Sequence, residues 1–316
     1  MISFIIIGKN ESSTLEYCFN SVFKTIKKYN ITRCDIWYID SCSTDNSVQI
    51  ASKYEEIQII ALSESCSPAI ARNIGAKNAK GEILFFIDGD TAINPDFVDF
   101  QELLIKNQVF IYGQYVNLSP KNISEDYNLS NISRKQGITY GIFIVEKQLF
   151  NHIGGFKEKY KKPGGEDIDF YLRLKRKGYN PTIIEETIAF HFSFDYLSSK
   201  RMWQNLLDHS QLYARSVLYR DHITSKNIWN LILRRETTLI SLITGISLSL
   251  FFSSIYPILI FVVVLFFRII FQKNLSLKNF LLRIIYYPIR DVYTFLGFFL
   301  FWPRKPKHVK WKKIKS

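Results

Sequence analysis

The chain has 316 residues, of which 47% are hydrophobic, and a formal net charge of +13, which suits one large domain with an appendage. Twelve Lys and Arg and a single acid, Asp291, fall in residues 268–316, a net charge of +11 that leaves +2 for the first 267 residues. A nucleic-acid-binding protein carries its basic residues across a folded face. The distribution therefore argues against nucleic acid and favours an anionic membrane surface, because the basic residues lie beside hydrophobic sequence.

The cysteines predict no metal site. Cys18, Cys34, Cys42 and Cys66 all fall in the first 66 residues and lack metal-ligand spacing. The apolar start at residues 2–7 is too short for a signal-peptide core and favours a first strand. Because no export signal is predicted, we expect the chain to stay in the reducing cytosol, where its cysteines would be free thiols.

Strand-like and helix-like segments alternate at the start of the chain. Ser13 and Glu16 have the spacing of a capping box, Ser67 and Pro68 are typical of a helix start, and Gly81 of a left-handed helix end. The alternation predicts an α/β fold with a doubly wound sheet. The segments predicted as strands are residues 2–8, 35–40, 57–62 and 82–88.

Two carboxylates follow the fourth predicted strand. Asp88 and Asp90 are separated only by Gly89. Ligands bind at the carboxyl edge of an open α/β sheet. Carboxylates there are hard oxygen ligands suited to Mg²⁺ or Mn²⁺ carrying a substrate diphosphate.

The middle of the chain continues the α/β pattern. Residues 198–221 form a Trp- and Tyr-rich amphipathic segment that predicts a lid or a membrane-facing helix. The other expected elements are a helix at 96–106, a strand at 109–116, a polar mobile loop at 119–136, a strand at 137–145, a helix at 166–177 closed by Gly178, and a strand at 180–185 that leads to His191.

The C-terminal third is hydrophobic. Residues 237–267 contain no charged side chain, with Pro257 near the middle, which fits one tilted span or two short ones. Because the basic end should be cytosolic, we predict a hairpin at 237–271 broken near 253–257, with 277–301 as an interfacial helix. A helix lying in the membrane interface is the alternative. The predicted organisation is a catalytic domain at 1–225, membrane-associated helices at 226–303 and a basic cytosolic tail at 304–316.

Several motifs in a fixed order give the chain a family resemblance. These motifs are Ile5 to Glu11, Ile39 to Ser47, Ala71 to Gly75, Phe86 to Asp90, Gly154 to Phe156, and Gly165 to Asp167. Through them the chain resembles the family 2 glycosyltransferases, inverting enzymes with the GT-A fold, over about residues 1–220. The processive-synthase motif Gln-x-x-Arg-Trp is missing, so we expect one sugar per acceptor.

The resemblance implies roles for individual side chains. Asp167 would be the catalytic base, with Glu166 beside it as a second candidate. The residues implied on the donor nucleotide are Asn10, Glu11, Asp40, Asp45, Arg72 and Asp88. The residues implied on a divalent metal, Mn²⁺ or Mg²⁺, are Asp90, Asp88 and His191.

These residues also have structural interpretations. Asp40 and Asp45 could cap the next helix, Arg72 could be a solvated helix residue, and Glu166 and Asp167 could favour a helix dipole. His152 and His209 are interpreted as structural.

We therefore expect a membrane-attached, metal-dependent, inverting glycosyltransferase on the cytosolic leaflet. It would transfer a sugar from a nucleotide-sugar donor to a lipid-linked or cell-envelope glycan acceptor. Such transfer requires a carboxylate that deprotonates the acceptor and a cation that stabilises the leaving diphosphate. The alternatives are a sugar-nucleotide pyrophosphorylase, disfavoured because no Gly-rich phosphate loop follows the first strand, and a nucleotide-sugar-binding scaffold or sensor at the membrane.

Overall fold

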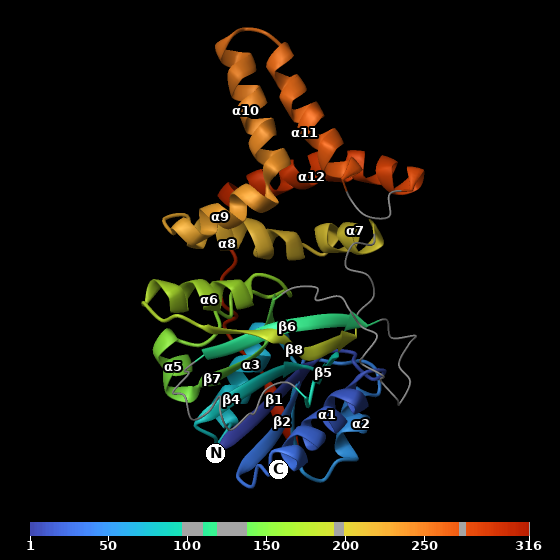
Figure 1. The fold of residues 1–316 in the computed structure, drawn as a ribbon, viewed down its shortest axis with the longest axis vertical. Coiled ribbons are helices and arrows are strands. Elements are labelled where there is room, and N and C mark those ends of the chain that lie inside the picture. The colour runs from blue at the N-terminus through green and yellow to red at the C-terminus, as the bar shows by residue number, and fades with distance from the viewer. Residues whose placement is uncertain (97–109, 119–137, 193–198, 272–275, 316) are drawn as a thin grey trace. The chain divides into compact units, whose positions relative to one another are not determined.

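The computed structural model describes residues 1–96, 110–118, 138–192, 199–271 and 276–315 (Figure 1). The chain divides into two compact units. Unit 1 comprises Met1–Asp195 and Arg304–Ser316, and unit 2 comprises Tyr196–Pro303. The predicted helix at 96–106 and loop at 119–136 lie almost wholly outside the described residues.

Unit 1 is built on a mixed sheet. Within the described residues the sheet has nine strands in the order β5-β8-β6-β7-β4-β1-β2-β3-β9. β1 pairs in parallel with β2 and β4, whereas β7 pairs antiparallel with β4. The strands are β1 (Ile2–Gly8), β2 (Cys34–Asp40), β3 (Ile57–Leu62), β4 (Ile83–Asp88), β5 (Thr91–Ile93), β6 (Phe110–Leu118), β7 (Ile138–Glu146), β8 (Thr182–Phe192) and β9 (Trp311–Lys315).

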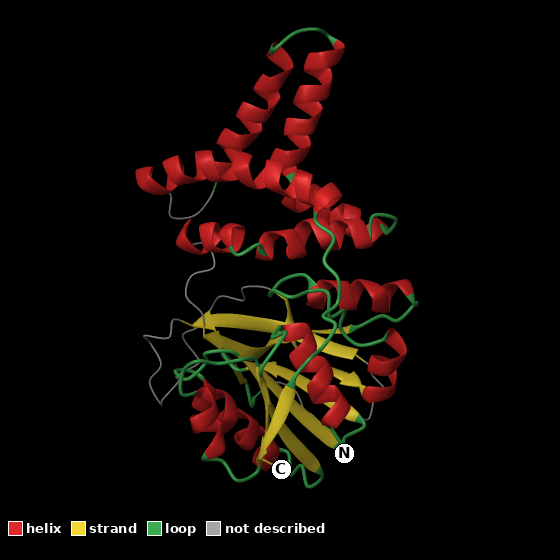
Figure 2. Cartoon of the chain, turned by 180° about the vertical axis from the view of Figure 1, so that it is seen from behind, coloured by secondary structure: helices red, strands yellow, loops and turns green. Residues whose placement is uncertain are grey.

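Helices cover both faces of this sheet (Figure 2). Phe4 and Ile6 of β1 pack with α1 (Leu15–Lys28) and α2 (Ser47–Ser52), whereas Ile5 and Ile7 pack with the helices of the other face. Because both faces are covered, the central strands are continuous apolar runs. The helices on the second face are α3 (Pro68–Asn78), α5 (Lys147–Ile153) and α6 (Glu166–Arg176).

Local signals for the helix ends were only partly correct. Ser67 caps α3, accepting a hydrogen bond from the Ile70 amide at 3.3 Å. The capping-box prediction was wrong, because α1 begins at Leu15 without a side-chain cap. Gly81 was also misread: it has no left-handed backbone, and a Cβ there would lie 2.6 Å from the Ser3 nitrogen. Close packing of two chain segments, not a helix end, requires this glycine.

The basic C-terminal segment is part of the sheet. β9 pairs antiparallel with β3, and the Ser63 amide donates to the Lys310 carbonyl at 2.9 Å. The Lys310 ammonium pairs with Glu64 at 2.7 Å. Residues 304–316, predicted as a separate tail, therefore supply a strand that covers the otherwise unpaired edge of β3.

Two cysteines are paired. Cys42 and Cys66 form a disulfide with their Cα atoms 6.1 Å apart, while Cys18 and Cys34 are free. The expectation of four free thiols was wrong for the first pair. These cysteines follow β2 and precede α3, so the fold brings together two positions that are 24 residues apart in sequence.

Unit 2 is helical in its described part. The segment predicted as one helix at 198–221 is divided into α7 (Ser199–Leu207), a π-helical turn (Leu212–Val217) and α8 (Leu218–Asp221). None of the helices in the described ranges is long and apolar enough to cross a membrane. The remaining elements are α9 (Lys226–Arg235), α10 (Thr237–Phe251), a 3₁₀ turn (Tyr256–Ile258), α11 (Leu259–Ile270) and α12 (Leu277–Leu300).

α10 and α11 form a hairpin that breaks between Phe251 and Tyr256, near the predicted position (Figure 1). Gly245 permits their close approach, because a Cβ there would lie 3.2 Å from the Ile258 Cα atom. The predicted helical hairpin is therefore present.

Three charged residues of α12, Arg283, Arg290 and Asp291, are buried, whereas Lys278 near its start is exposed. Arg290 and Asp291 are at most 2% exposed and pair with each other. Arg290 also donates to the Thr238 hydroxyl at 3.0 Å and lies 3.4 Å from a Glu236 carboxylate oxygen, and Arg215 pairs with Glu236. This network joins α12 to the junction of α9 and α10.

Candidate active site

The loops after β1 and β2 are joined by reciprocal hydrogen bonds. The Asn10 backbone amide donates to the Ser43 hydroxyl at 2.9 Å, and the Thr44 backbone amide donates to the Asn10 side-chain oxygen at 2.7 Å. Asn10 has φ of 60°, a left-handed conformation that Asn tolerates better than most residues. The fold therefore brings the predicted donor residues of both loops to one edge of the sheet.

Asp40 and Asp45 hold the second loop in shape. Asp40 is buried and accepts hydrogen bonds from the Ser43 amide at 2.9 Å and the Tyr38 hydroxyl at 3.2 Å. Partial burial opposes the charged form of Asp45, but hydrogen bonds from Ser47 and Ser12 outweigh it and lower its pKa to about 2. Asp45 accepts hydrogen bonds from the Ser47 amide at the start of α2 and from the Ser12 amide of the loop after β1, each at 3.0 Å, whereas these partners of Asp40 lie outside α2.

Arg72 links the sheet edge to α6. Its guanidinium, 3% exposed, donates to Asp88 at 2.7 Å and to Glu166 at 3.1 Å, and it lies over the Phe156 ring at 5.3 Å. Arg72 is therefore no solvated helix residue. It connects a predicted donor carboxylate to the helix that carries the predicted base.

Three carboxylates gather at the end of β4. Burial, followed by the charges of Asp90 and Asp88, raises the pKa of Glu11 to about 8. Burial also raises the pKa of Asp88, with Arg72 opposing and Asp90 reinforcing the shift. Gly89 allows this crowding, because a Cβ there would lie 3.2 Å from the Glu11 Cγ atom. A divalent cation would relieve mutual repulsion of this kind.

Asp90 and His191 meet through the pairing of two strands. Thr91 of β5 pairs with His191 of β8, and the His191 Nε2 atom lies 3.1 Å from an Asp90 carboxylate oxygen. The described ranges contain no group of three His, Cys, Asp or Glu arranged to hold a metal. The structure thus joins two of the three predicted metal residues directly and leaves Asp88 paired with Arg72.

Glu166 and Asp167 begin α6 after two glycines with positive φ, Gly164 and Gly165. Both oxygens of Glu166 are engaged, one by Arg72 and the other by the Gly164 amide at 2.9 Å. Burial and the adjacent Asp167 raise the pKa of Glu166 to about 7, against the effect of Arg72. Asp167 is only partly buried and accepts a hydrogen bond from the Ile168 amide at 2.8 Å.

Asn73 is a positioning residue that the sequence analysis missed. Its side chain exchanges two hydrogen bonds with the Phe156 backbone, each 2.9 Å, and a Cβ at Gly155 would lie 2.8 Å from its amide oxygen. The motif from Ala71 to Gly75 therefore contacts the motif from Gly154 to Phe156 through Asn73. Both motifs were recognised in the sequence, but their order gives no sign that they touch.

Comparison with known proteins gives two family matches. The model of glycosyl transferase family 2 matches residues 3–157, and the model of the N-terminal domain of galactosyltransferase matches residues 125–195. Together the matches cover the donor loops, the acidic cluster, α6 and β8.

Individual relatives agree with these matches. The chain is 25% identical over 212 residues to glycosyltransferase AglE of Haloferax volcanii, covering 60% of this chain and 66% of AglE. It is 31% identical over 98 residues to poly(ribitol-phosphate) β-N-acetylglucosaminyltransferase TarS of Staphylococcus aureus, covering 30% of this chain and 17% of TarS.

The fold is similar to that of a solved glycosyltransferase structure. The mannosyltransferase PcManGT of Pyrobaculum calidifontis, in complex with GDP-Man and Mn²⁺, aligns with a TM-score of 0.56 at 13% identity. The alignment covers 95% of this chain and 87% of PcManGT. The predicted GT-A-like, mixed α/β fold is thereby confirmed.

Proposed function

We propose that the chain is a nucleotide-sugar-dependent glycosyltransferase of family 2, the family whose model matches residues 3–157, and that it catalyses inverting, metal-assisted transfer of one sugar. The acceptor is a lipid-linked or cell-envelope glycan, and the reaction takes place at the cytoplasmic face of the cell membrane. The family matches support a transferase over the pyrophosphorylase and scaffold alternatives.

The bridge formed by Arg72 is the observation that carries this proposal. Its guanidinium contacts Asp88 at 2.7 Å on the donor side and Glu166 at 3.1 Å on α6. Asp88, assigned to the donor, and Glu166, the neighbour of the assigned base Asp167, are thereby held at one site. A single-displacement transfer needs this closeness, because acceptor oxygen and anomeric carbon must meet in one transition state.

The donor nucleotide is assigned to the loops after β1 and β2, with Asn10, Glu11, Asp40, Asp45 and Arg72 around it. The engaged oxygens of Asp40 and Asp45 suggest that these two residues act mainly by shaping the pocket. Asp88 holds the ribose side. The choice of base and sugar is left to experiment.

A divalent cation, Mn²⁺ or Mg²⁺, is assigned to Asp90 and His191, with Asp88 nearby. Mg²⁺ is commonly held by one or two carboxylates together with substrate phosphates, so a set smaller than three protein ligands is sufficient. The cation would neutralise the departing diphosphate. The binding of GDP-Man and Mn²⁺ by PcManGT, which has the same fold, is consistent with this assignment.

Asp167 is assigned as the base. Its carboxylate takes the proton from the acceptor hydroxyl while that oxygen attacks the anomeric carbon, and the bond to the diphosphate oxygen breaks on the opposite side. The nucleoside diphosphate leaves with the bonding electron pair, and the configuration at the anomeric carbon is inverted. Glu166 is less suited to this role, because both of its oxygens are already engaged.

Asp167→Asn and Glu166→Gln separate these roles. The first variant removes the base but keeps the size of the side chain, so it should lose transfer while retaining nucleotide-induced stabilisation. The second keeps Asp167, so it should retain measurable transfer. Transfer by Asp167→Asn at the wild-type rate would overturn the assignment of the base.

A further inference from the structure

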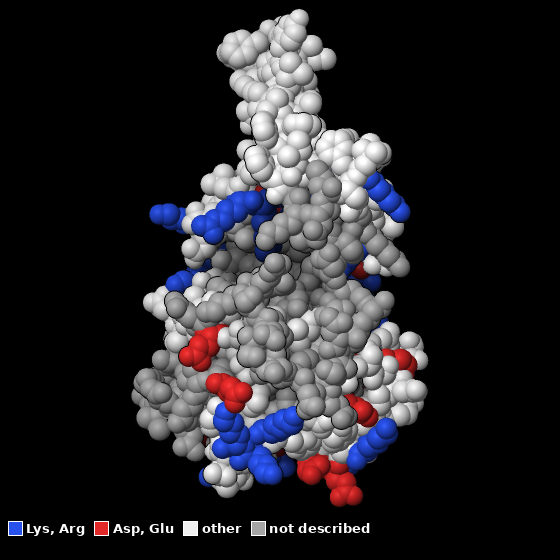
Figure 3. Space-filling view, turned by 45° about the vertical axis from the view of Figure 1, so that its right-hand side comes forward, with Lys and Arg blue, Asp and Glu red and all other residues white. Residues whose placement is uncertain are grey.

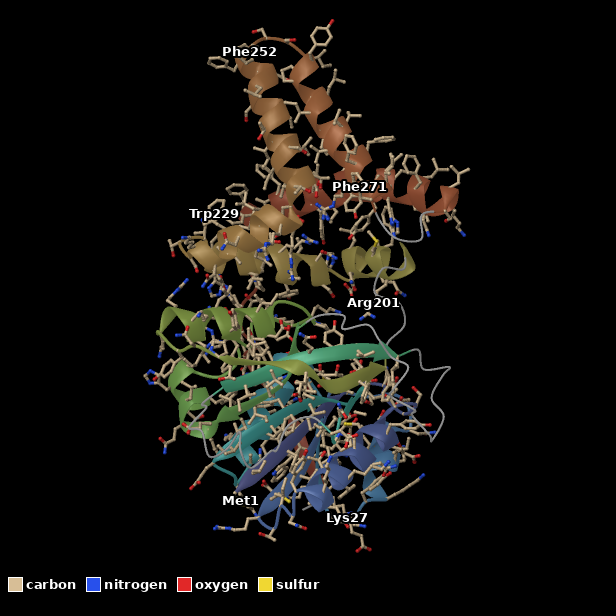
Figure 4. The ribbon with its side chains drawn as sticks, viewed as in Figure 1. Met1, Lys27, Arg201, Trp229, Phe252 and Phe271 are labelled. Carbon is tan, nitrogen blue, oxygen red and sulfur yellow. A yellow bond between two sulfur atoms is a disulfide. The ribbon has the colours of Figure 1, made fainter. Side chains whose placement is uncertain are left out.

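The tip of the α10–α11 hairpin exposes large apolar side chains. Leu250, Phe251, Phe252, Ile255 and Tyr256 are between 63% and 77% exposed. The hairpin shows no basic or acidic atoms in the view of Figure 3, and Phe252 lies at its far end in Figure 4. A protein groove would cover one side of a helix, whereas this tip is apolar on both sides of the break.

α12 has the polarity of a helix in lipid. One stripe along it is apolar and exposed, although surface helices of soluble domains place charges there. The opposite stripe carries Arg283, Arg290 and Asp291 and is buried in unit 2. The exposed stripe comprises Leu281, Ile285, Ile289, Val292, Leu296 and Phe299, and the buried stripe comprises Arg283, Tyr287, Arg290, Asp291, Thr294 and Gly297.

The charges around this surface have one sign. Residues 226–303 contain eight Lys and Arg and two acids, Glu236 and Asp291. Both acids are 0% exposed, whereas Lys226, Arg234 and Lys278 are exposed. The accessible charge of this segment is therefore basic, which complements anionic lipid headgroups.

Tryptophans mark the borders of the apolar surface. Trp229 on α9 is 47% exposed and Trp302, just after α12, is 66% exposed. Trp229 and Phe271 lie near the base of the hairpin, away from Phe252 (Figure 4). Trp is enriched at the level of the headgroups, where one part of the ring is apolar and another can donate a hydrogen bond.

The length of the hairpin fits a single leaflet. The 15 residues of α10 rise about 22 Å at roughly 1.5 Å per residue. A hydrocarbon core of about 30 Å gives roughly 15 Å per leaflet. The arm is thus long enough for its tip to reach the acyl chains while its base stays among the headgroups.

We propose that unit 2 is a monotopic membrane anchor. The α10–α11 hairpin inserts its tip into one leaflet, α12 lies in the headgroup region with its apolar stripe toward the acyl chains, and the exposed basic residues bind anionic headgroups. This anchor goes beyond the proposed transfer reaction, because it concerns binding to lipid and can be tested without activity.

Vesicle flotation of the full chain tests the anchor. The variant Phe251→Ser/Phe252→Ser/Tyr256→Ser removes three apolar side chains from the tip and should lower partitioning into vesicles of phosphatidylcholine and phosphatidylglycerol by about 100-fold or more. Ile183→Ser is the matched control: it removes a half-exposed apolar side chain from β8 of unit 1 and should float like wild type.

A second pair of substitutions tests the charges. Lys226→Gln/Arg234→Gln should weaken binding to vesicles with phosphatidylglycerol by about tenfold or more and leave binding to pure phosphatidylcholine unchanged. Melting curves establish that each variant is folded.

Two outcomes overturn the anchor. The first is a folded tip variant that floats as well as wild type. The second is a wild-type chain that self-associates without lipid and is dissociated by the tip substitutions while flotation stays the same, since a second copy would then cover the surface. Failure of the wild-type chain to bind any nucleotide would count against the proposed transfer reaction and would leave the anchor unaffected.

Discussion

Replacing Arg72 with Met removes the charge that bridges two carboxylates while keeping the length of the side chain. Breaking a buried ion pair costs about 3–5 kcal/mol, because the remaining charge is left without a partner. The pair with Glu166 is the more buried, at 3% and 6% side-chain exposure, whereas the Asp88 side chain is 33% exposed. Solvent screening reduces the contribution of the Asp88 pair. We therefore expect a loss of stability at the lower end of that range, about 3 kcal/mol.

That loss should be visible as a shift in melting temperature. About 1 kcal/mol corresponds to roughly 2–4 °C in a domain of 150–250 residues. Arg72→Met should therefore lower the melting temperature of unit 1 by about 6–12 °C at pH 8.

The pH dependence identifies the cause. Burial and Asp167 raise the pKa of Glu166 to about 7, and Arg72 opposes this shift. Without Arg72 the pKa rises further. A carboxyl whose folded pKa is raised above its unfolded value loses stability as the pH rises through the folded pKa. The deficit of the variant should thus be large at pH 8 and smaller at pH 6.

Differential scanning calorimetry of wild type, Arg72→Met and Arg72→Met/Glu166→Gln at both pH values provides the measurement. The second substitution removes the unpaired charge and should restore part of the stability at pH 8. The reasoning would be refuted if Arg72→Met melted like wild type at pH 8, or if its loss of melting temperature were equal at both pH values.

Three further predictions concern the site and the sheet. Asp167→Asn should reduce transfer by about 10²–10⁴-fold, measured as release of nucleoside diphosphate, and leave nucleotide-induced stabilisation intact; equal loss of both would mean a structural role. Because the pKa of Glu11 is raised to about 8, a cation must displace a proton, so Mn²⁺-dependent nucleotide affinity should rise between pH 7 and pH 9 in calorimetric titrations. Glu11→Gln should flatten this rise, and an unchanged slope would contradict it. Deleting residues 304–316 should expose the edge of β3, lower the melting temperature and cause self-association in light scattering; an unchanged monomer would refute that role.

The strands of unit 1 were predictable because both faces of the sheet are covered. Runs such as Ile83 to Ile87 must then be apolar throughout, which is a strong local signal. The two carboxylates at the end of this strand lie at the carboxyl edge of the sheet, as the direction of the strand predicts.

The partners of those carboxylates could not be predicted. Arg72 and Glu166 are 94 positions apart, and nothing local to either residue shows that they pair. His191 meets Asp90 because β5, only three residues long, pairs with β8. A strand that short carries no periodicity in the sequence.

The C-terminal half shows the limits of reading composition. A Lys-rich segment resembles a solvated tail, yet β9 pairs with β3 through backbone groups that do not depend on its side chains. Arg290 and Asp291 resemble surface charges, but with Glu236 they form a paired network inside unit 2. Such pairing lowers the cost of burying charge, and it is visible only once the helices are packed.

The most direct test of the central claim is a thermal-shift panel on the full chain with UDP, GDP, dTDP and CMP, each with and without Mn²⁺, and with Asp90→Asn as the control. A ligand at a hundred times its dissociation constant adds about 2.7 kcal/mol. A metal-assisted glycosyltransferase should be stabilised by at least one nucleotide, with Mn²⁺ required and the effect lost in Asp90→Asn. Stabilisation by none of them, with or without the metal, would contradict the donor site.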